Sequence, residues 1–324
     1  MALLLLSCLW HLPALAGQNG RGNNRSDAII FPPSSPPATI WFVTPMLFSG
    51  ARDRDIADMW DRDLGFIFKD KDTNPASYAL NFPTAGANGL YFDLVIYGYV
   101  DGLTWTPVTH EGITATVKQI TEMERLARNR NWFLTRHPFS FVRVTLTGPD
   151  ASAQRGNPHL SRIPVPRLPQ TFELVGRDPY YGEEVIKYGF VLQKWFVHQG
   201  GSPWYTYSDT VAWCGGVGYR VPQVKELTNA VCDFHRCEGA VGATPSSIKG
   251  NYSSRWIGAG FFTEWGEVFY YRGANFDSLD YWTSDSRGDR FKYMVQSNGH
   301  IDSDFVLDVD GFNVHRHNSI CVTP

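Results

Sequence analysis

The side chains of this chain that could ligate a metal or move a proton are few and scattered. After residue 186, the only histidines close together in the sequence are His315 and His317. Two residues apart on a strand, they would share one face, so a surface metal pair is one interpretation of them. Gly-x-Ser-x-Gly, His-Glu-x-x-His and phosphate-loop patterns do not occur. We therefore predict no catalytic residue, no cofactor and no metal site.

Two acidic runs have the oxygen-rich composition of calcium sites. Residues 70–74, Asp-Lys-Asp-Thr-Asn, supply the first three oxygen positions of a calcium loop. However, Pro75 stands where that loop needs a Gly, and Asn81 stands where it needs a bidentate Glu. We interpret this run as a polar turn. The second run, which we interpret as a solvated strand face, consists of Asp302, Asp304, Asp308 and Asp310.

The N-terminus predicts export. An apolar run from Met1 to Trp10 is too short to span a bilayer as a helix, and no Lys or Arg precedes it. Ala14-Leu15-Ala16 offers the small residues that signal peptidase requires, so we predict a signal peptide over residues 1–16. Residues 17–38, rich in Gly, Asn, Ser and Pro, should form an extended tether. The mature protein is expected in the periplasm, at the cell surface or outside the cell.

Four cysteines remain once the signal peptide is removed: Cys214, Cys232, Cys237 and Cys321. In an exported chain an even number of cysteines favours disulfides, and four cysteines allow three pairings. A zinc site is the competing interpretation. Its ligand spacing would be poor, because Cys232 and Cys237 are four residues apart with His235 between them.

Composition and net charge indicate a folded chain whose partner is not nucleic acid. Aromatic residues make up 15% of the 324 residues, which is typical of a folded chain and not of a disordered one. The net charge is −3 and the basic residues are thinly spread, which argues against nucleic acid as the partner.

The first half of the chain predicts a β-sandwich over residues 39–180. Its short segments are rich in β-branched and aromatic residues and lie between clusters of Gly, Pro, Asn and Asp. A helix is predicted over residues 118–131, a Pro-rich loop over residues 148–169 and a last strand over residues 171–176. The other predicted strands are residues 40–43, 65–68, 91–97, 113–117 and 141–146.

The second half, residues 186–324, predicts a mixture of strands and helices. Residues 188–197 should form one strand. A first helix should begin at Ser208 or Asp209 and stop at Gly215-Gly216. A second helix should begin at Pro222 and place three apolar residues on one stripe: Val224, Leu227 and Val231.

The order of landmarks in this half resembles the C-type-lectin-like domain that ends bacterial adhesins of the intimin and invasin family. These landmarks are Trp213-Cys214, Gly218–Pro222 leading into Lys225–Leu227, Trp256-Ile257-Gly258, Tyr281–Asp285 and Cys321. The resemblance implies a mainly β fold with some α: an immunoglobulin-like sandwich followed by an α+β lectin-like domain. It also implies a Cys214–Cys321 disulfide, which leaves Cys232 to pair with Cys237. Five residues are expected in the core: Trp213, Trp256, Trp282, Leu227 and Ile257.

The resemblance implies a non-catalytic adhesin, or a secreted autotransporter-associated protein of that group. Its partner would be a protein receptor on a host cell or a bacterial outer-membrane adhesin, with membrane contact only through that partner. In the family the partner docks between the strand after Trp-Ile-Gly and the last Cys, which is residues 264–310 here. Aromatic residues and Arg favour interface centres, so the candidate binding residues are Trp265, Tyr270, Tyr271, Arg272, Asp289, Arg290 and Asp302.

Two alternatives belong to other functional classes. A formylglycine-generating oxidase shares the lectin-like fold, but it needs a pair of reactive cysteines. A calcium-dependent lectin needs a Trp-Asn-Asp strand, and this chain has Trp282-Thr283-Ser284-Asp285 in that place.

Overall fold

The computed structural model describes residues 38–45, 56–69, 73–98, 100–121, 138–157, 159–200, 205–306 and 315–324. Residues 35–324 form one compact unit. The predicted signal peptide, nearly all of the tether and most of the helix predicted over residues 118–131 lie outside the described residues. So do Asp70, Asp72, Asp308 and Asp310 of the acidic runs.

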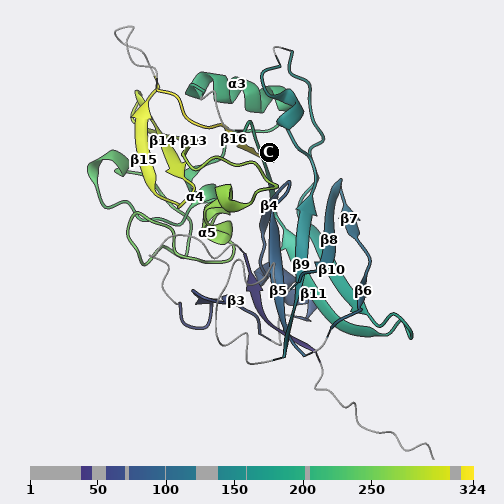
Figure 1. The fold of residues 1–324 in the computed structure, drawn as a ribbon. Coiled ribbons are helices and arrows are strands. Elements are labelled where there is room, and N and C mark those ends of the chain that lie inside the picture. Colours follow the sequence, from purple (N-terminus) through teal and green to yellow (C-terminus); the bar gives the residue numbers. More distant parts are fainter. Residues whose placement is uncertain are drawn as a thin grey trace, which may run out of the picture. The chain divides into compact units, whose positions relative to one another are not determined.

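The first half of the described chain forms a β-sandwich (Figure 1). Its larger sheet is antiparallel throughout. In strand β9 every second residue from Ser140 to Leu146 is buried, so one face of this strand packs into the core. In sheet order the strands are β2 (Trp60–Asp61), β3 (Gly65–Ile67), β1 (Thr39–Thr44), β5 (Tyr91–Tyr97), β9 (Phe139–Thr147), β8 (Ile113–Gln119) and β7 (Val108–His110).

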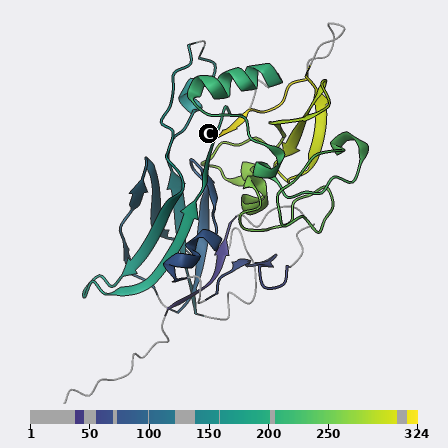
Figure 2. The ribbon, with the colours of Figure 1, turned by 180° about the vertical axis from the view of Figure 1, so that it is seen from behind.

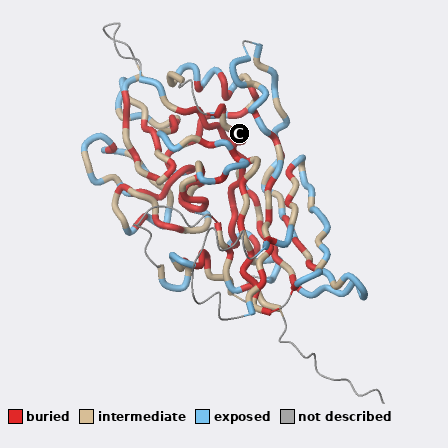
Figure 3. The backbone as a smooth tube through the Cα atoms, in the orientation of Figure 1, coloured by how far each residue is buried: buried red, intermediate tan, exposed pale blue. Residues whose placement is uncertain are grey.

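The smaller sheet packs on the larger one through aromatic rings. Its strands are β11 (Glu184–Leu192), β10 (Gln170–Arg177) and β6 (Thr104–Trp105). The ring of Phe92 lies 5.9 Å from that of Tyr188 and 6.0 Å from that of Phe190, which joins the two sheets. Phe172 stacks on Phe190 at 5.2 Å. Burying one such ring stabilises the fold by roughly 1.5–3 kcal/mol, and Figure 3 shows buried backbone running along these strands.

A third sheet joins the two halves of the chain. It contains β16 (Ile320–Val322), β12 (Lys194–His198) and β4 (Ala85–Ala87), and β4 runs parallel to β12. The single strand predicted over residues 188–197 is therefore wrong, because the chain leaves β11 at Leu192 and enters β12 at Lys194. The break lies where the amide of Gln193 donates to the carbonyl of Thr84 at 2.7 Å.

The second half adds an antiparallel sheet and short helices. The sheet contains β13 (Asp280–Arg287), β14 (Phe291–Gln296) and β15 (Ile301–Phe305). Figure 2 shows helix α3 beside the C-terminus on the third sheet. No helix within the described ranges is long and apolar enough to cross a membrane. The helices are α3 (Tyr207–Val217), α4 (Val224–Leu227), α5 (Phe261–Trp265), and the 3-10 helices η3 (Pro75–Leu80), η4 (Ser152–Gln154), η5 (His235–Cys237) and η6 (Val268–Tyr270).

Helix α3 begins earlier and ends later than predicted. Its cap is Thr206, whose hydroxyl accepts from the amide of Asp209 at 3.1 Å, while the Asp209 carboxylate accepts from the Thr206 amide at 3.2 Å. The predicted stop, Gly215-Gly216, lies inside the helix. The last residue of the helix is Val217, and Gly218 caps it with a φ of 95°, which favours glycine.

Helix α4 ends at Leu227 and is much shorter than the predicted helix, which was to include Val231. Val224 and Leu227 are buried as expected, but Val231 lies beyond the helix and is 41% exposed. The start of the helix predicted over residues 118–131 also differs, because Lys118 and Gln119 belong to strand β8.

The fold class, mainly β with some α, is confirmed, as are the strands predicted within β1, β3, β5, β8, β9 and β10. The division into residues 39–180 and 186–324 remains a prediction. Ile186, at its boundary, lies in β11 and pairs with Gly176 of β10. One hydrophobic cluster also includes residues of both parts, from Ile40 to Val322.

Both expected disulfides are present. Cys214 of α3 pairs with Cys321 of β16, 107 residues away, and Cys232 pairs with Cys237. Cys214 and Cys321 are fully buried in the core. A link across so long a loop typically stabilises a fold by about 2–4 kcal/mol, mainly by restricting the unfolded chain.

Candidate functional site

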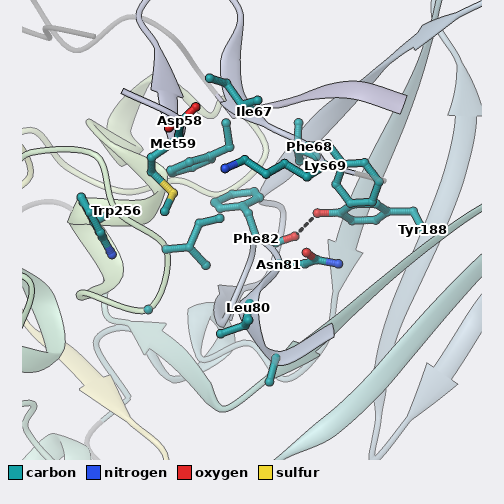
Figure 4. Close-up of a pocket in the computed structure, with 15 residues that line it drawn as sticks. Asp58, Met59, Ile67, Phe68, Lys69, Leu80, Asn81, Phe82, Tyr188 and Trp256 are labelled. Carbon is teal, nitrogen blue, oxygen red and sulfur yellow. Dashed lines mark hydrogen bonds between the residues drawn. The ribbon is translucent and has the colours of Figure 1, made fainter. Parts of the chain in front are cut away.

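An apolar cleft of about 340 Å³ opens between the sandwich and the loop that carries Trp256-Ile257-Gly258. Cavities of this size take a small ligand or a side chain of a partner. Figure 4 shows Trp256 and Tyr188 at opposite ends of the cleft with Phe82 between them. The residues that line it are Val43, Asp58, Met59, Phe66, Ile67, Phe68, Lys69, Ala79, Leu80, Asn81, Phe82, Tyr188, Trp256, Ile257 and Gly258.

The floor of the cleft is built from packed rings. Phe66 stacks on Phe82 at 5.2 Å, and Phe68 lies 5.4 Å from Tyr188. The Tyr188 hydroxyl donates to the carbonyl of Phe82, so the one polar atom of this wall is satisfied (Figure 4). Phe82 also meets Trp265 of α5 edge-on at 4.7 Å. These rings hold one another in place, and the floor is therefore preformed.

The rim of the cleft carries exposed and half-buried side chains. Leu80 is 70% exposed, and Trp256 and Ile257 are half-buried. Asp58 and Lys69 bring one charge of each sign to the rim. The expected core position is wrong for Trp256, whereas Ile257 is half-buried and packs against the edge of the core. The other three expected core residues, Trp213, Trp282 and Leu227, are buried.

A buried carboxylate fixes the wall of the cleft. Glu264 of α5 accepts from the amide of Gly258 at 2.7 Å, from the amide and hydroxyl of Thr84 at 3.0 and 2.6 Å, and from the amide of Ala85 at 3.1 Å. Burial raises the pKa of Glu264 to about 7, against the opposing effect of these hydrogen bonds. Glu264 thus ties the loop at Gly258 to strand β4 of the other half.

A second buried carboxylate stabilises the segment between α3 and α4. Glu226 accepts from Arg220 at 2.7 and 2.8 Å, from Lys194 at 2.7 Å and from the amide of Gln223 at 2.9 Å. Burial acts to raise the pKa of Glu226, but the bonds from Arg220 and Lys194 outweigh it and hold the pKa at about 2. The Arg220 and Glu226 landmarks are therefore structural.

The two neighbouring histidines share one carboxylate. His315 Nδ1 and His317 Nε2 each lie 2.9 Å from Asp304 Oδ2, and His317 Nδ1 lies 3.8 Å from Asp280. Burial acts to raise the pKa of Asp304, but the hydrogen bond from His317 and the charge of both histidines lower it overall. Within the described ranges, no group of three or more His, Cys, Asp or Glu side chains could hold a metal ion.

The second acidic run is not a solvated face in its described part. Asp304 is buried against the histidines, and Asp302 is half-buried and binds Arg236 at 2.7 Å. Because the Asp302 carboxylate already accepts from Arg236, it is less available to bind a partner than its prediction as a binding residue implies.

Two of the seven candidate binding residues are core residues. Trp265 and Tyr271 are fully buried. Trp265 donates from its indole nitrogen to the carbonyl of Ala85 at 2.8 Å, and the Tyr271 hydroxyl donates to the carbonyl of Trp265 at 3.1 Å. Neither side chain can reach a partner, because Trp265 packs on Phe82 and Tyr271 packs on Tyr91 of the sandwich. Their assignment as binding residues is therefore corrected.

The other candidates come from separate elements. Tyr270 is 41% exposed at the end of η6, where its ring lies 4.0 Å from that of Phe269, and Arg272 is exposed two residues later. Asp289 and Arg290 are exposed in the turn between β13 and β14. The four exposed candidates therefore form two pairs on separate elements, Tyr270 with Arg272 and Asp289 with Arg290.

The cleft itself is not predicted by any pattern in the sequence, although one residue of its wall carries a recognisable signal. Glu264 is a carboxylate inside the apolar run Phe-Phe-Thr-Glu-Trp at residues 261–265, and a charged residue in such a run is buried only when it is paired.

Comparisons with known proteins are sparse. No protein-family model matches the chain, and no curated protein matches it. Among solved structures, the chain is similar to "Crystal structure of invasin: a bacterial integrin-binding protein", with a TM-score of 0.47 and 12% sequence identity. The match covers 89% of this chain and 40% of the invasin chain, so this chain spans two fifths of the length of that protein.

Proposed function

We propose that this chain is a non-catalytic, exported adhesin or adhesin-associated protein that binds a protein partner through its C-terminal half. The observation that carries the proposal is the pairing of all four cysteines in the described residues. Disulfides persist in oxidising compartments, which agrees with export. An oxidase of the formylglycine type needs reactive cysteines, and paired cysteines supply none.

The contact surface in this proposal is the exposed pair Tyr270 and Arg272, with Asp289 and Arg290 as a second pair. Tyr and Arg are the residue types that most often dominate binding energy, because they bury a large area and make directed hydrogen bonds. In this proposal the cleft receives an apolar side chain of the partner, since its ring floor is preformed and needs no rearrangement.

A cell-binding assay tests the proposal. The purified chain, with its disulfides intact, is labelled and offered to mammalian epithelial cells and to the parent bacterium. Saturable binding to host cells, competed by unlabelled protein and lost after reduction, supports a host-directed adhesin. Saturable binding to the bacterium alone supports an accessory of another surface protein. Binding to neither overturns the proposal.

A further inference from the structure

The hairpin between β10 and β11 presents two tyrosines to solvent. Tyr180 is 89% exposed and Tyr181 is 83% exposed, more than any other large apolar side chain in the described ranges. Figure 3 shows this hairpin end as an exposed stretch that projects past the rest of its sheet. Single exposed apolar residues are ordinary on protein surfaces. Two adjacent tyrosines at the tip of a protruding hairpin are the pair of ring side chains best placed to contact a partner.

The turn that carries these tyrosines is well defined. Asp178 Oδ1 accepts from the amides of both Tyr180 and Tyr181 at 2.8 Å. The amide of Gly182 donates to the Asp178 carbonyl at 2.9 Å, and Gly182 has a φ of 70°, which favours glycine. The Arg177 side chain donates to the Gly182 carbonyl at 3.1 Å. A turn already held in one conformation loses less entropy when it binds.

The base of the hairpin is held in place by strand pairing and side-chain packing. Strand β6 pairs with the end of β10, where Trp105 lies opposite Gly176. A Cβ atom added at Gly176 would lie 2.7 Å from the Trp105 ring, so the indole packs directly on the backbone there. Ile186 on β11 is buried beside it. The tyrosines are therefore presented by a three-stranded sheet.

The charges around the tip select the chemistry of the occupant. Three carboxylates, those of Asp178, Glu183 and Glu184, flank the tyrosines in the hairpin, beside two cations, Arg177 and Lys187. Glu184 is 3.7 Å from Lys187, while the Glu183 side chain extends into solvent. An acidic tip is repelled by an anionic membrane surface but complements a basic protein surface.

We propose that the β10–β11 tip is a second contact surface, at which Tyr180 and Tyr181 insert into an apolar pocket with a basic rim on a protein partner. This surface is formed by the sandwich and is distinct from Tyr270 and Arg272 of the C-terminal half. The inference rests on the proposed function, because it assumes that the chain binds a protein on a cell.

The test compares variants in the cell-binding assay. Tyr180→Ser/Tyr181→Ser should weaken saturable binding roughly tenfold or more, since each tyrosine is an anchor. Tyr180→Phe/Tyr181→Phe should stay within about threefold of wild type, because the rings supply most of the contact. Glu183→Lys should slow association, as expected for a basic partner. All these residues are exposed, so the melting temperature should not change.

Each outcome decides the question. If wild type binds but Tyr180→Ser/Tyr181→Ser binds equally well, the tip is no contact surface, and the proposed function stands. If wild type binds neither cell type, both proposals fail. Vesicles of phosphatidylcholine and phosphatidylserine are the final probe. Saturable vesicle binding that requires the two tyrosines would make the tip a lipid contact and overturn the protein partner.

Discussion

The carboxylate of Glu264 accepts a hydrogen bond from the hydroxyl of Thr84 at 2.6 Å, across 180 residues of sequence. Thr84 precedes strand β4 of the first half, and Glu264 lies in helix α5 of the second. Glu264 also accepts from the amide of Gly258. Through these two hydrogen bonds, Glu264 fixes the loop at Gly258, which lines the cleft, to the sandwich. The two halves therefore share a buried polar contact in addition to the third sheet.

Glu264→Ala should destabilise the protein by about 3 kcal/mol or more. The substitution leaves the buried amides of Thr84 and Ala85 without their acceptor, and each such group costs roughly 1–3 kcal/mol. The measurement is urea unfolding followed by tryptophan fluorescence. Glu183→Ala, which removes an exposed carboxylate, is the matched control and should unfold like wild type. Equal midpoints for Glu264→Ala and wild type would contradict the role given to Glu264.

The stability of the protein should fall between pH 4.5 and pH 2 because of Glu226. Its pKa is about 2 in the fold, against an ordinary value of 4.5, so its contribution is present above pH 4.5 and lost as the pH falls through 2. We expect this contribution to be about 2 kcal/mol, because solvent screens its partners Arg220 and Lys194, which are 42% and 39% exposed.

Glu226→Gln isolates this effect. The variant should be less stable than wild type at pH 7, and the difference should shrink as the pH approaches 2. Chemical unfolding at a series of pH values measures it. A difference that stays constant from pH 7 to pH 2 would show that Glu226 does not titrate as described.

The two disulfides should contribute unequally to stability. Cys214–Cys321 closes a loop of 107 residues, whereas Cys232–Cys237 closes one of 5. Cys214→Ser/Cys321→Ser should therefore cost about 2–5 kcal/mol, and Cys232→Ser/Cys237→Ser clearly less. Calorimetric melting of both variants compares them directly. A thiol titration of the denatured mature protein should find no free thiol; reactive thiols would favour the oxidase instead.

Filling the cleft should weaken binding to the partner without loss of stability. Ala79 is exposed on η3 and lines the cleft, so Ala79→Phe should occupy the space that a partner's side chain needs. We expect about a tenfold loss of affinity for the cell type that wild type binds. Ala76→Phe adds the same ring to the same 3-10 helix away from the cleft lining and is the control. If both variants bind like wild type, the cleft takes no part.

Local patterns predicted much of the fold. Strand segments were identified because runs such as residues 91–97 are rich in β-branched and aromatic side chains. The break at Gln193 could not be predicted, because it depends on the carbonyl of Thr84, which is distant in sequence. Likewise, α3 continued through Gly215-Gly216 because a glycine pair weakens a helix without necessarily ending it.

The candidate site was predicted less well than the fold. Aromatic residues at 265, 270 and 271 look alike in sequence, yet only Tyr270 is exposed. Which ring faces inward is decided by the position of α5 against β4, a contact between segments far apart in the chain. The core position predicted for Trp256 is wrong because an apolar residue suits the wall of a cleft as well as a core, and sequence alone does not distinguish the two.

One comparison of affinities tests whether exposed residues of the C-terminal half bind a protein partner. The dissociation constant of Tyr270→Ala/Arg272→Ala is measured on the cell type that wild type binds, beside Val231→Ala. Val231 is the control because it is 41% exposed, as Tyr270 is, and belongs to another segment. We expect the affinity of the double variant to fall roughly tenfold or more and that of the control to stay unchanged. Equal affinity of the double variant and wild type would contradict this expectation.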